Sequence, residues 1–157
     1  MIQISPKHLQ FIRTHGEKTY PEECCGLLLG KQEDDRNKLV VEVWQTENSW
    51  DGDAVSAFSE ITESGKREAS KYRSFTIAPQ DMLKAQKYAH ERQLKIIGIY
   101  HSHPDHDAIP SEFDRAVAWQ EYSYLIVSVQ SGKAVDARSW VLDQHSQFVE
   151  EKLSISN

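Results

Sequence analysis

The sequence lacks the features that mark secreted, membrane-bound or disulfide-stabilised proteins. It has only two cysteines, Cys24 and Cys25, and because they are adjacent a bridge between them would close almost no loop. No apolar run approaches the ~20 residues that a transmembrane helix needs. The first ten residues do not show the basic and then apolar build of a signal peptide. We therefore expect a cytoplasmic protein with reduced thiols and no membrane segment.

The chain is also short of positive charge, with 18 Lys and Arg against 24 Asp and Glu, and a net charge of −6. This balance argues against broad nucleic-acid binding, and we expect no nucleic-acid partner. What remains is an ordinary composition, 39% apolar and 27% charged, without internal repeats or low-complexity tracts. Since 157 residues suffice for one domain and hardly for two, we predict a single domain over 1–157.

Apolar patterning and helix breakers predict a mixture of helices and strands. Ser5 and Pro6 have the pattern of a helix start, and Pro21 is expected to end that helix. The predicted helices span 5–19, 79–92 and 111–120. The predicted strands are short apolar or β-branched runs at 25–30, 39–45, 72–77, 95–100, 124–129 and 134–142. This order indicates an α/β (α+β) fold with a central mixed sheet flanked by helices.

Two stretches are predicted to lack regular structure. Residues 46–71 are polar, and a connection of that length is usually functional or mobile. Residues 63–73 carry four positive charges, which suit either a solvated loop or a lid or docking site for a protein tail. The tail after Asp143 is also polar.

The residues best suited to metal binding and catalysis follow directly after the apolar run 95–100. His101 and His103 are two positions apart, so on a strand both imidazoles point to one face and can bind one ion. A catalytic zinc ion takes three protein ligands of the imidazole or carboxylate type and keeps a water molecule. The candidates for the third ligand are Asp105, His106, Asp107 and Asp114.

Each part of this pattern has an interpretation without a metal. A histidine pair at a strand end can be a polar rim, and Ser111-x-x-Asp114 is a pattern typical of a helix N-cap. Asp105, His106 and Asp107 can belong to a polar loop, or can orient the imidazoles from outside the ligand set.

The joint pattern is more specific than its parts. His101-Ser-His103-Pro, six residues, Ser111, two residues and Asp114 match without departure the signature His-x-His-Pro-x6-Ser-x2-Asp of the JAMM (MPN-plus) metalloproteases. The sequence is most similar to compact, stand-alone bacterial members, and the resemblance covers most of residues 1–142. It implies an MPN/JAMM-like (cytidine-deaminase-like) architecture. The other stretches that carry it are 21–30, 77–83, 97–104 and 124–128.

The resemblance also implies roles for individual residues. His101, His103 and Asp114 would bind one Zn²⁺ ion with water at the fourth position, and the Ser111 hydroxyl would stabilise the oxyanion. The family also uses a glutamate that carries the proton of the attacking water to the leaving amine.

Two adjacent glutamates, Glu22 and Glu23, are candidates for this proton carrier. Similar bacterial proteins show the run Glu-x-Cys-Gly, which here aligns Glu23 with Cys25 and Gly26. We therefore predict Glu23 as the base, Glu22 as a solvated turn residue, and Cys25 as a small buried hydrophobe.

The resemblance thus implies a zinc metallopeptidase or isopeptidase that hydrolyses an amide bond. Some relatives cleave after the C-terminal di-glycine of ubiquitin-like sulfur-carrier proteins, and we predict such a tail as the substrate. A non-catalytic scaffold on the same fold is an alternative of another class. A metallo-β-lactamase-fold hydrolase is a further one, with Asp105 and His106 as ligands and Ser111 and Asp114 idle. A metal other than zinc also suits this ligand set.

Overall fold

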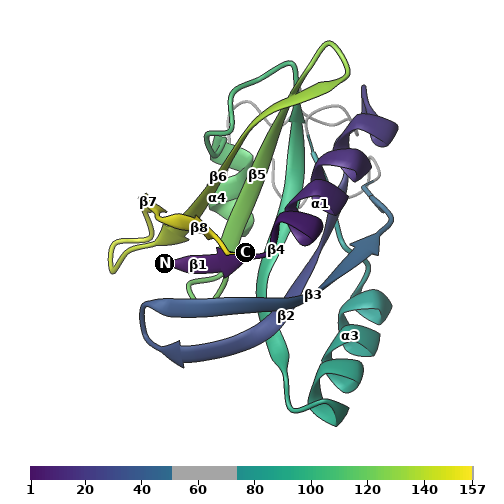
Figure 1. Cartoon of the computed structure of the whole chain (residues 1–157). Coiled ribbons are helices and arrows are strands. Elements are labelled where there is room, and N and C mark those ends of the chain that lie inside the picture. The colour runs from purple at the N-terminus through teal and green to yellow at the C-terminus, as the bar shows by residue number, and fades with distance from the viewer. Residues whose placement is uncertain (51–73, 157) are drawn as a thin grey trace.

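The computed structural model describes residues 1–50 and 74–156 (Figure 1). Its three described helices are α1 (Pro6–Thr19), α3 (Pro79–Glu91) and α4 (Glu112–Val117). The strands are β1 (Ile2–Ile4), β2 (Cys25–Asp34), β3 (Asn37–Thr46), β4 (Lys95–Pro104), β5 (Ser123–Gln130), β6 (Lys133–Leu142), β7 (Phe148–Glu151) and β8 (Leu153–Ile155). The result is an α+β fold, as the sequence predicts.

All of these strands belong to one mixed sheet with the order β7-β6-β5-β4-β2-β3-β1-β8. β4 and β5 run parallel, and β1 runs parallel to both β3 and β8, whereas the other neighbouring strands are antiparallel. β7 and β8 lie at opposite ends of this order, yet only Lys152 separates them in the chain. The C-terminal stretch therefore connects the two edges of the sheet, and the Lys152 carbonyl accepts a hydrogen bond from Ile2 N at 3.0 Å.

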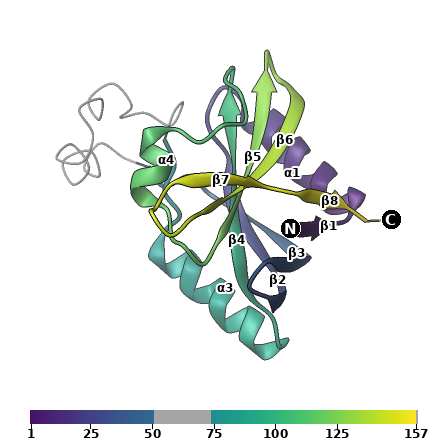
Figure 2. The ribbon, with the colours of Figure 1, turned by 90° about the vertical axis from the view of Figure 1, so that its left-hand side faces the viewer.

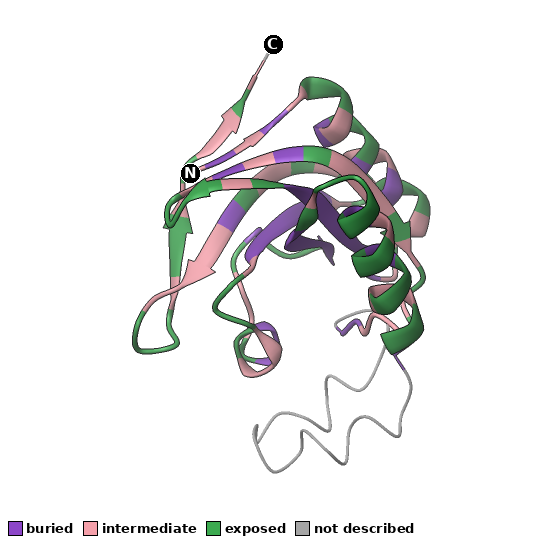
Figure 3. Cartoon of the chain, turned by 90° about the horizontal axis from the view of Figure 1, so that it is seen from below, coloured by how far each residue is buried: buried purple, intermediate pink, exposed green. Residues whose placement is uncertain are grey.

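Helices cover both faces of the sheet. α1 packs on one face, and α3 and α4 lie on the other (Figure 2). Buried positions gather in the middle of the sheet, and exposed ones lie on the outer sides of the helices (Figure 3). Each face has its own apolar core. The α1 side includes Leu9, Ile12, Leu28, Tyr100 and Val127, and the α3 side includes Leu27, Phe75, Ala85, Ile99 and Phe113.

Gly26 of β2 lies opposite Tyr100 of β4, whose ring occupies the space that a side chain at position 26 would need. A Cβ atom at Gly26 would be 2.1 Å from the Tyr100 ring and 2.4 Å from the Trp44 carbonyl oxygen. Glycine is therefore required, because only its missing side chain leaves room for the tyrosine. This contact holds β4 firmly just before its two histidines.

Most of the predicted elements are confirmed, with boundaries that differ by a few residues. Ser5 caps α1 by accepting a hydrogen bond from His8 N at 3.1 Å, and Tyr20, before Pro21, is its C-cap. The strand predicted at 95–100 continues to Pro104, because β4 lies between β2 and β5. The helix predicted to reach residue 120 ends at Val117.

Three predictions about the strands need correction. Residues 74–78 are not a strand, since their backbone bonds mainly to residues 48 and 49 rather than to a sheet neighbour. The polar tail after residue 143 supplies β7 and β8, whose backbones find partners at both sheet edges. β1 was not predicted, because three residues are too few to show a pattern. Residues 51–73, which include the whole of the lid or docking segment predicted at 63–73, lie outside the described residues.

None of the helices within residues 1–50 and 74–156 has the length and apolar character needed to cross a membrane.

A histidine in the core makes the stability of this fold depend on pH. His15 on α1 lies with Nδ1 2.7 Å from the Tyr100 hydroxyl on β4, and burial lowers its pKa to about 4. Below pH ~6.5 the unfolded chain binds a proton at this position that the folded chain does not. We therefore expect the free energy of unfolding to fall between pH 6.5 and 4, with His15 contributing on the order of 1–2 kcal/mol of that loss.

Urea unfolding of the wild type and of His15→Gln, measured at pH 7 and pH 5, tests this contribution. The difference in free energy between the two proteins should shrink at pH 5, because the variant has no buried imidazole to protonate. The same difference at both pH values would contradict the prediction.

Candidate metal centre

The carboxyl end of β4 supplies two imidazoles to one face of the sheet. β4 is hydrogen-bonded to β2 on one side and to β5 on the other, and every residue from Ile96 to Pro104 is buried. His101 and His103 are two positions apart on this strand, so both rings point toward α4. Their Nε2 atoms lie 3.2 Å apart.

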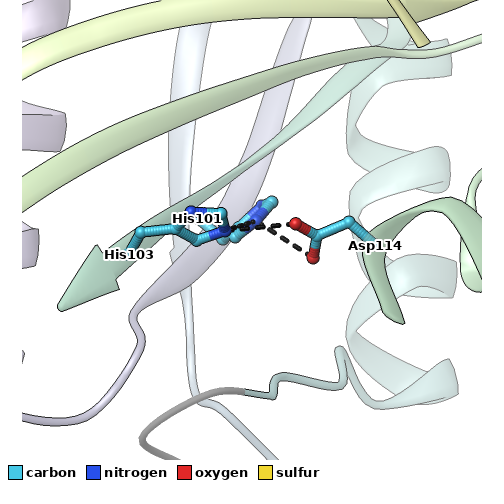
Figure 4. Close-up of side chains that lie close together, drawn as sticks. All are labelled: His101, His103 and Asp114. Atoms are coloured by element: carbon cyan, nitrogen blue, oxygen red, sulfur yellow. Dashed lines mark hydrogen bonds and ion pairs between the residues drawn. The ribbon is translucent and has the colours of Figure 1, made fainter. Parts of the chain in front are cut away.

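α4 supplies a carboxylate that faces the two rings (Figure 4). Asp114 Oδ1 lies 3.2 Å from His101 Nε2, and Asp114 Oδ2 lies 3.1 Å from His103 Nε2. Among the residues that the structure describes, this is the group of three buried side chains that could hold a metal ion. The structure therefore brings together three of the predicted ligands from two elements.

A capping box fixes the direction of the Asp114 carboxylate. The Ser111 hydroxyl accepts a hydrogen bond from Asp114 N at 3.1 Å, and Asp114 Oδ2 accepts one from Ser111 N at 2.9 Å. The N-cap interpretation of Ser111 is thus confirmed, and it does not compete with a metal-binding interpretation. The cap holds the carboxylate where a ligand is needed.

The separations between the ligand atoms suit a small divalent ion. Ligand atoms that lie about 2.0–2.1 Å from a tetrahedral zinc ion are about 3.3 Å from one another. His103 Nδ1 lies 2.8 Å from the Asp107 carbonyl oxygen, which can only accept, so Nδ1 carries the proton. Neutral His103 therefore presents the lone pair of Nε2 to the Asp114 carboxylate. Two acceptors at this distance require a cation or a proton between them, so the residues fit a metal ion.

Burial and charge set the protonation of this group. Burial alone would raise the pKa of Asp114, but the adjacent imidazoles outweigh it and lower that pKa. Burial lowers the pKa of His101, whose ring stacks on Phe75 at a centroid distance of 4.5 Å. Burial also opposes protonation of His103, but its hydrogen bond and charge interaction with Asp114 raise its pKa. In the metal-free protein, a proton is thus favoured between His103 and Asp114, at the place that suits a metal cation.

Glu23 lies two residues before β2, whose first residue, Cys25, pairs with His101. The contact between the two segments continues one residue further, where Ser102 N donates to the Cys24 carbonyl at 3.1 Å. Because side chains alternate along an extended chain, we expect Glu23 to share the face of the sheet that Cys25 and His101 occupy. Glu23 is buried, with 4% of its surface exposed, whereas its neighbour is only half-buried.

The other candidates for the third ligand lie elsewhere. Asp105 accepts hydrogen bonds from the Tyr20 hydroxyl at 2.6 Å and from Ser131 N at 2.8 Å, which ties the loop to α1 and the β5–β6 turn. His106 and Asp107 are exposed. A ligand set with Asp105 and His106, as in the metallo-β-lactamase-fold alternative, is therefore not formed here.

The two cysteines behave as the sequence predicts. Both are buried and free, and burial raises the pKa of each thiol to about 12. A thiol with so high a pKa stays protonated, so neither is a thiolate ligand or nucleophile at neutral pH.

Sequence reasoning did not select two residues that shape the site. The Phe75 ring covers His101, and Asn48 binds the backbone on either side of Phe75. A lone aromatic or asparagine in a polar stretch has no spacing that predicts such contacts.

The fold and the site define a JAB/MPN-type domain with a candidate metal centre. The chain matches over residues 5–143 the family model described as prokaryotic homologs of the JAB domain. The protein belongs to this family, and the resemblance noted in the sequence is confirmed. No protein with a curated description matches the chain.

Solved structures agree with this assignment. A solution structure of a protein from Desulfitobacterium hafniense has a TM-score of 0.76 at 25% identity, over 99% of this chain and 93% of that one. A solution structure from Salinibacter ruber has a TM-score of 0.68 at 31% identity, over 100% and 92%. The crystal structure of a JAB1/MPN domain protein from Archaeoglobus fulgidus, at 15% identity and a TM-score of 0.52 over 99% and 95%, shares the fold.

The site predicts tight binding of one divalent ion per chain. Asp114→Asn keeps an oxygen that can cap α4 but removes the charge that holds the ion, so we expect affinity for zinc to fall at least ~10²-fold with the fold intact. Competition with a chromophoric chelator measures this. Glu112→Gln is the matched control in the same helical turn, because its exposed side chain pairs with Arg115. Equal affinity of Asp114→Asn and the wild type would contradict the assignment.

Proposed function

We propose that the protein is a zinc-dependent metallopeptidase or isopeptidase that hydrolyses an amide bond. The observation that carries the proposal is the convergence of two imidazoles and a carboxylate, with Ser111 at the adjacent helix start. The buried Glu23 lies two residues before the strand that pairs with His101. The family match supports it, because JAB-type domains with this signature include JAMM metalloproteases.

His101, His103 and Asp114 would hold the ion. When bound, zinc would polarise the scissile carbonyl and lower the pKa of its water toward about 7. Glu23 would take the proton of that water and deliver it to the leaving amine.

The Ser111 hydroxyl can take part in the reaction as well as in the helix cap. Its oxygen serves the cap as an acceptor, so its O–H proton is left to donate to the oxyanion that forms on the carbonyl. Two neutral imidazoles and one carboxylate leave a divalent ion with a net positive charge, which attracts the same oxyanion.

The substrate we propose is the C-terminal di-glycine tail of a ubiquitin-like or sulfur-carrier protein. Glu23, His101, His103 and Asp114 are each at most 7% exposed as whole residues. A substrate backbone therefore has to come close to reach them. Glycine allows this approach because it has no side chain to exclude.

Cleavage of a carrier protein fused through its terminal di-glycine to a reporter tests the function. We expect the zinc-loaded wild type to release the reporter, and a chelator to stop the reaction reversibly. Zinc binding without cleavage of any such fusion would favour a non-catalytic scaffold instead.

Glu23→Gln should separate binding from chemistry. The amide cannot carry the proton, so we expect turnover to fall about 10²–10⁴-fold while zinc affinity stays near that of the wild type. Glu22→Gln is the control, since this half-buried neighbour is not assigned a role. If Glu23→Gln cleaves as fast as the wild type, the proton carrier is another residue.

A further inference from the structure

Asn48, two residues after β3, has a side chain that uses its full hydrogen-bonding capacity. Nδ2 donates to the Glu23 carbonyl at 3.1 Å and to the Ser74 carbonyl at 2.9 Å. Oδ1 accepts from Trp50 N at 3.0 Å and from Thr76 N at 3.2 Å. A side-chain amide has two N–H donors and two acceptor lone pairs, so all four are engaged.

All four partners are main-chain groups, and they belong to three separate segments. One segment carries Glu23, the second is the stretch 47–50 that contains Asn48 itself, and the third is 74–76. A backbone hydrogen bond from Ser49 N to Thr76 O, at 2.8 Å, joins the last two as well. Asn48 therefore joins three stretches that lie outside the strands of the sheet.

Asn48 reaches the candidate metal centre by two routes. Through the Glu23 carbonyl it holds the backbone of the proposed proton carrier. Through Ser74 and Thr76 it holds both neighbours of Phe75, whose ring stacks on His101 with an interplanar angle of 24°. The Asn48 amide thus positions the backbone of Glu23, the proposed base. It also positions Phe75, whose ring stacks on the candidate ligand His101.

We propose that Asn48 is a positioning residue that holds Glu23 and the His101 ring in register for catalysis. The catalytic part of this inference rests on the proposed function. The part that concerns His101 does not, because metal binding reports it without any cleavage. Only asparagine suits the position: aspartate lacks the two donors, and alanine leaves the buried Ser74 carbonyl without this partner.

Cobalt(II) as a spectroscopic probe and cleavage kinetics together test the proposal. In Asn48→Ala we expect the visible spectrum of the Co²⁺-loaded protein to change and Co²⁺ affinity to fall about 10–100-fold. We expect kcat on the di-glycine fusion to fall by a similar factor, with KM changed less than about threefold. Asn37→Ala is the matched control: it removes an asparagine bonded to Asp34 in the remote β2–β3 turn, and all three readouts should stay at wild-type values.

Phe75→Leu keeps the four main-chain partners of Asn48 and removes only the ring that covers His101. It should change the Co²⁺ spectrum even if Asn48→Ala fails to fold. A wild-type Co²⁺ spectrum in both variants would overturn the role toward His101. A wild-type kcat in folded Asn48→Ala would overturn the role toward Glu23. If the wild type cleaves no fusion, the proposed function fails, and the Co²⁺ measurements still decide the His101 role.

Discussion

The site depends on one buried carboxylate that is shared between a helix cap and two imidazoles. Asp114 closes the capping box with Ser111 and faces His101 and His103 at 3.1–3.2 Å. A buried charge is stable only when paired and hydrogen-bonded, and here the same partners satisfy both needs. The short helix α4 and the end of β4 are thereby joined at the point where chemistry is proposed. A divalent ion would strengthen this junction, because it replaces a contact between acceptors by ligand bonds.

The rest of the fold makes that junction rigid. β4 has partners on both sides, Gly26 lets Tyr100 lie close against β2, and the C-terminal strands connect both edges of the sheet. A ligand set needs its atoms held within fractions of an ångström, which a strand in the middle of a sheet provides better than a loop. The segments 47–50 and 74–78, which are not regular strands, are held instead by hydrogen bonds from the side-chain amide of Asn48.

Much of the fold and of the metal group could be predicted from the sequence, because local rules govern it. Two histidines at i and i+2 share a face of any strand, and Ser-x-x-Asp starts a helix with the carboxylate turned back to the cap. The strands after residue 143 could not be predicted, because no local rule governs them. Their residues have no clear period, and they become strands only because two sheet edges offer hydrogen bonds.

By itself the sequence determined the types and spacing of the metal ligands, the helix caps and the apolar strands, since each depends on neighbours a few residues apart. Only the tertiary structure decided that Phe75 covers His101, and that Asn48 joins the segments of Glu23 and Phe75. These contacts join residues 25 or 26 positions apart in the chain. They follow from how strands pair and layers pack, and no local pattern encodes them.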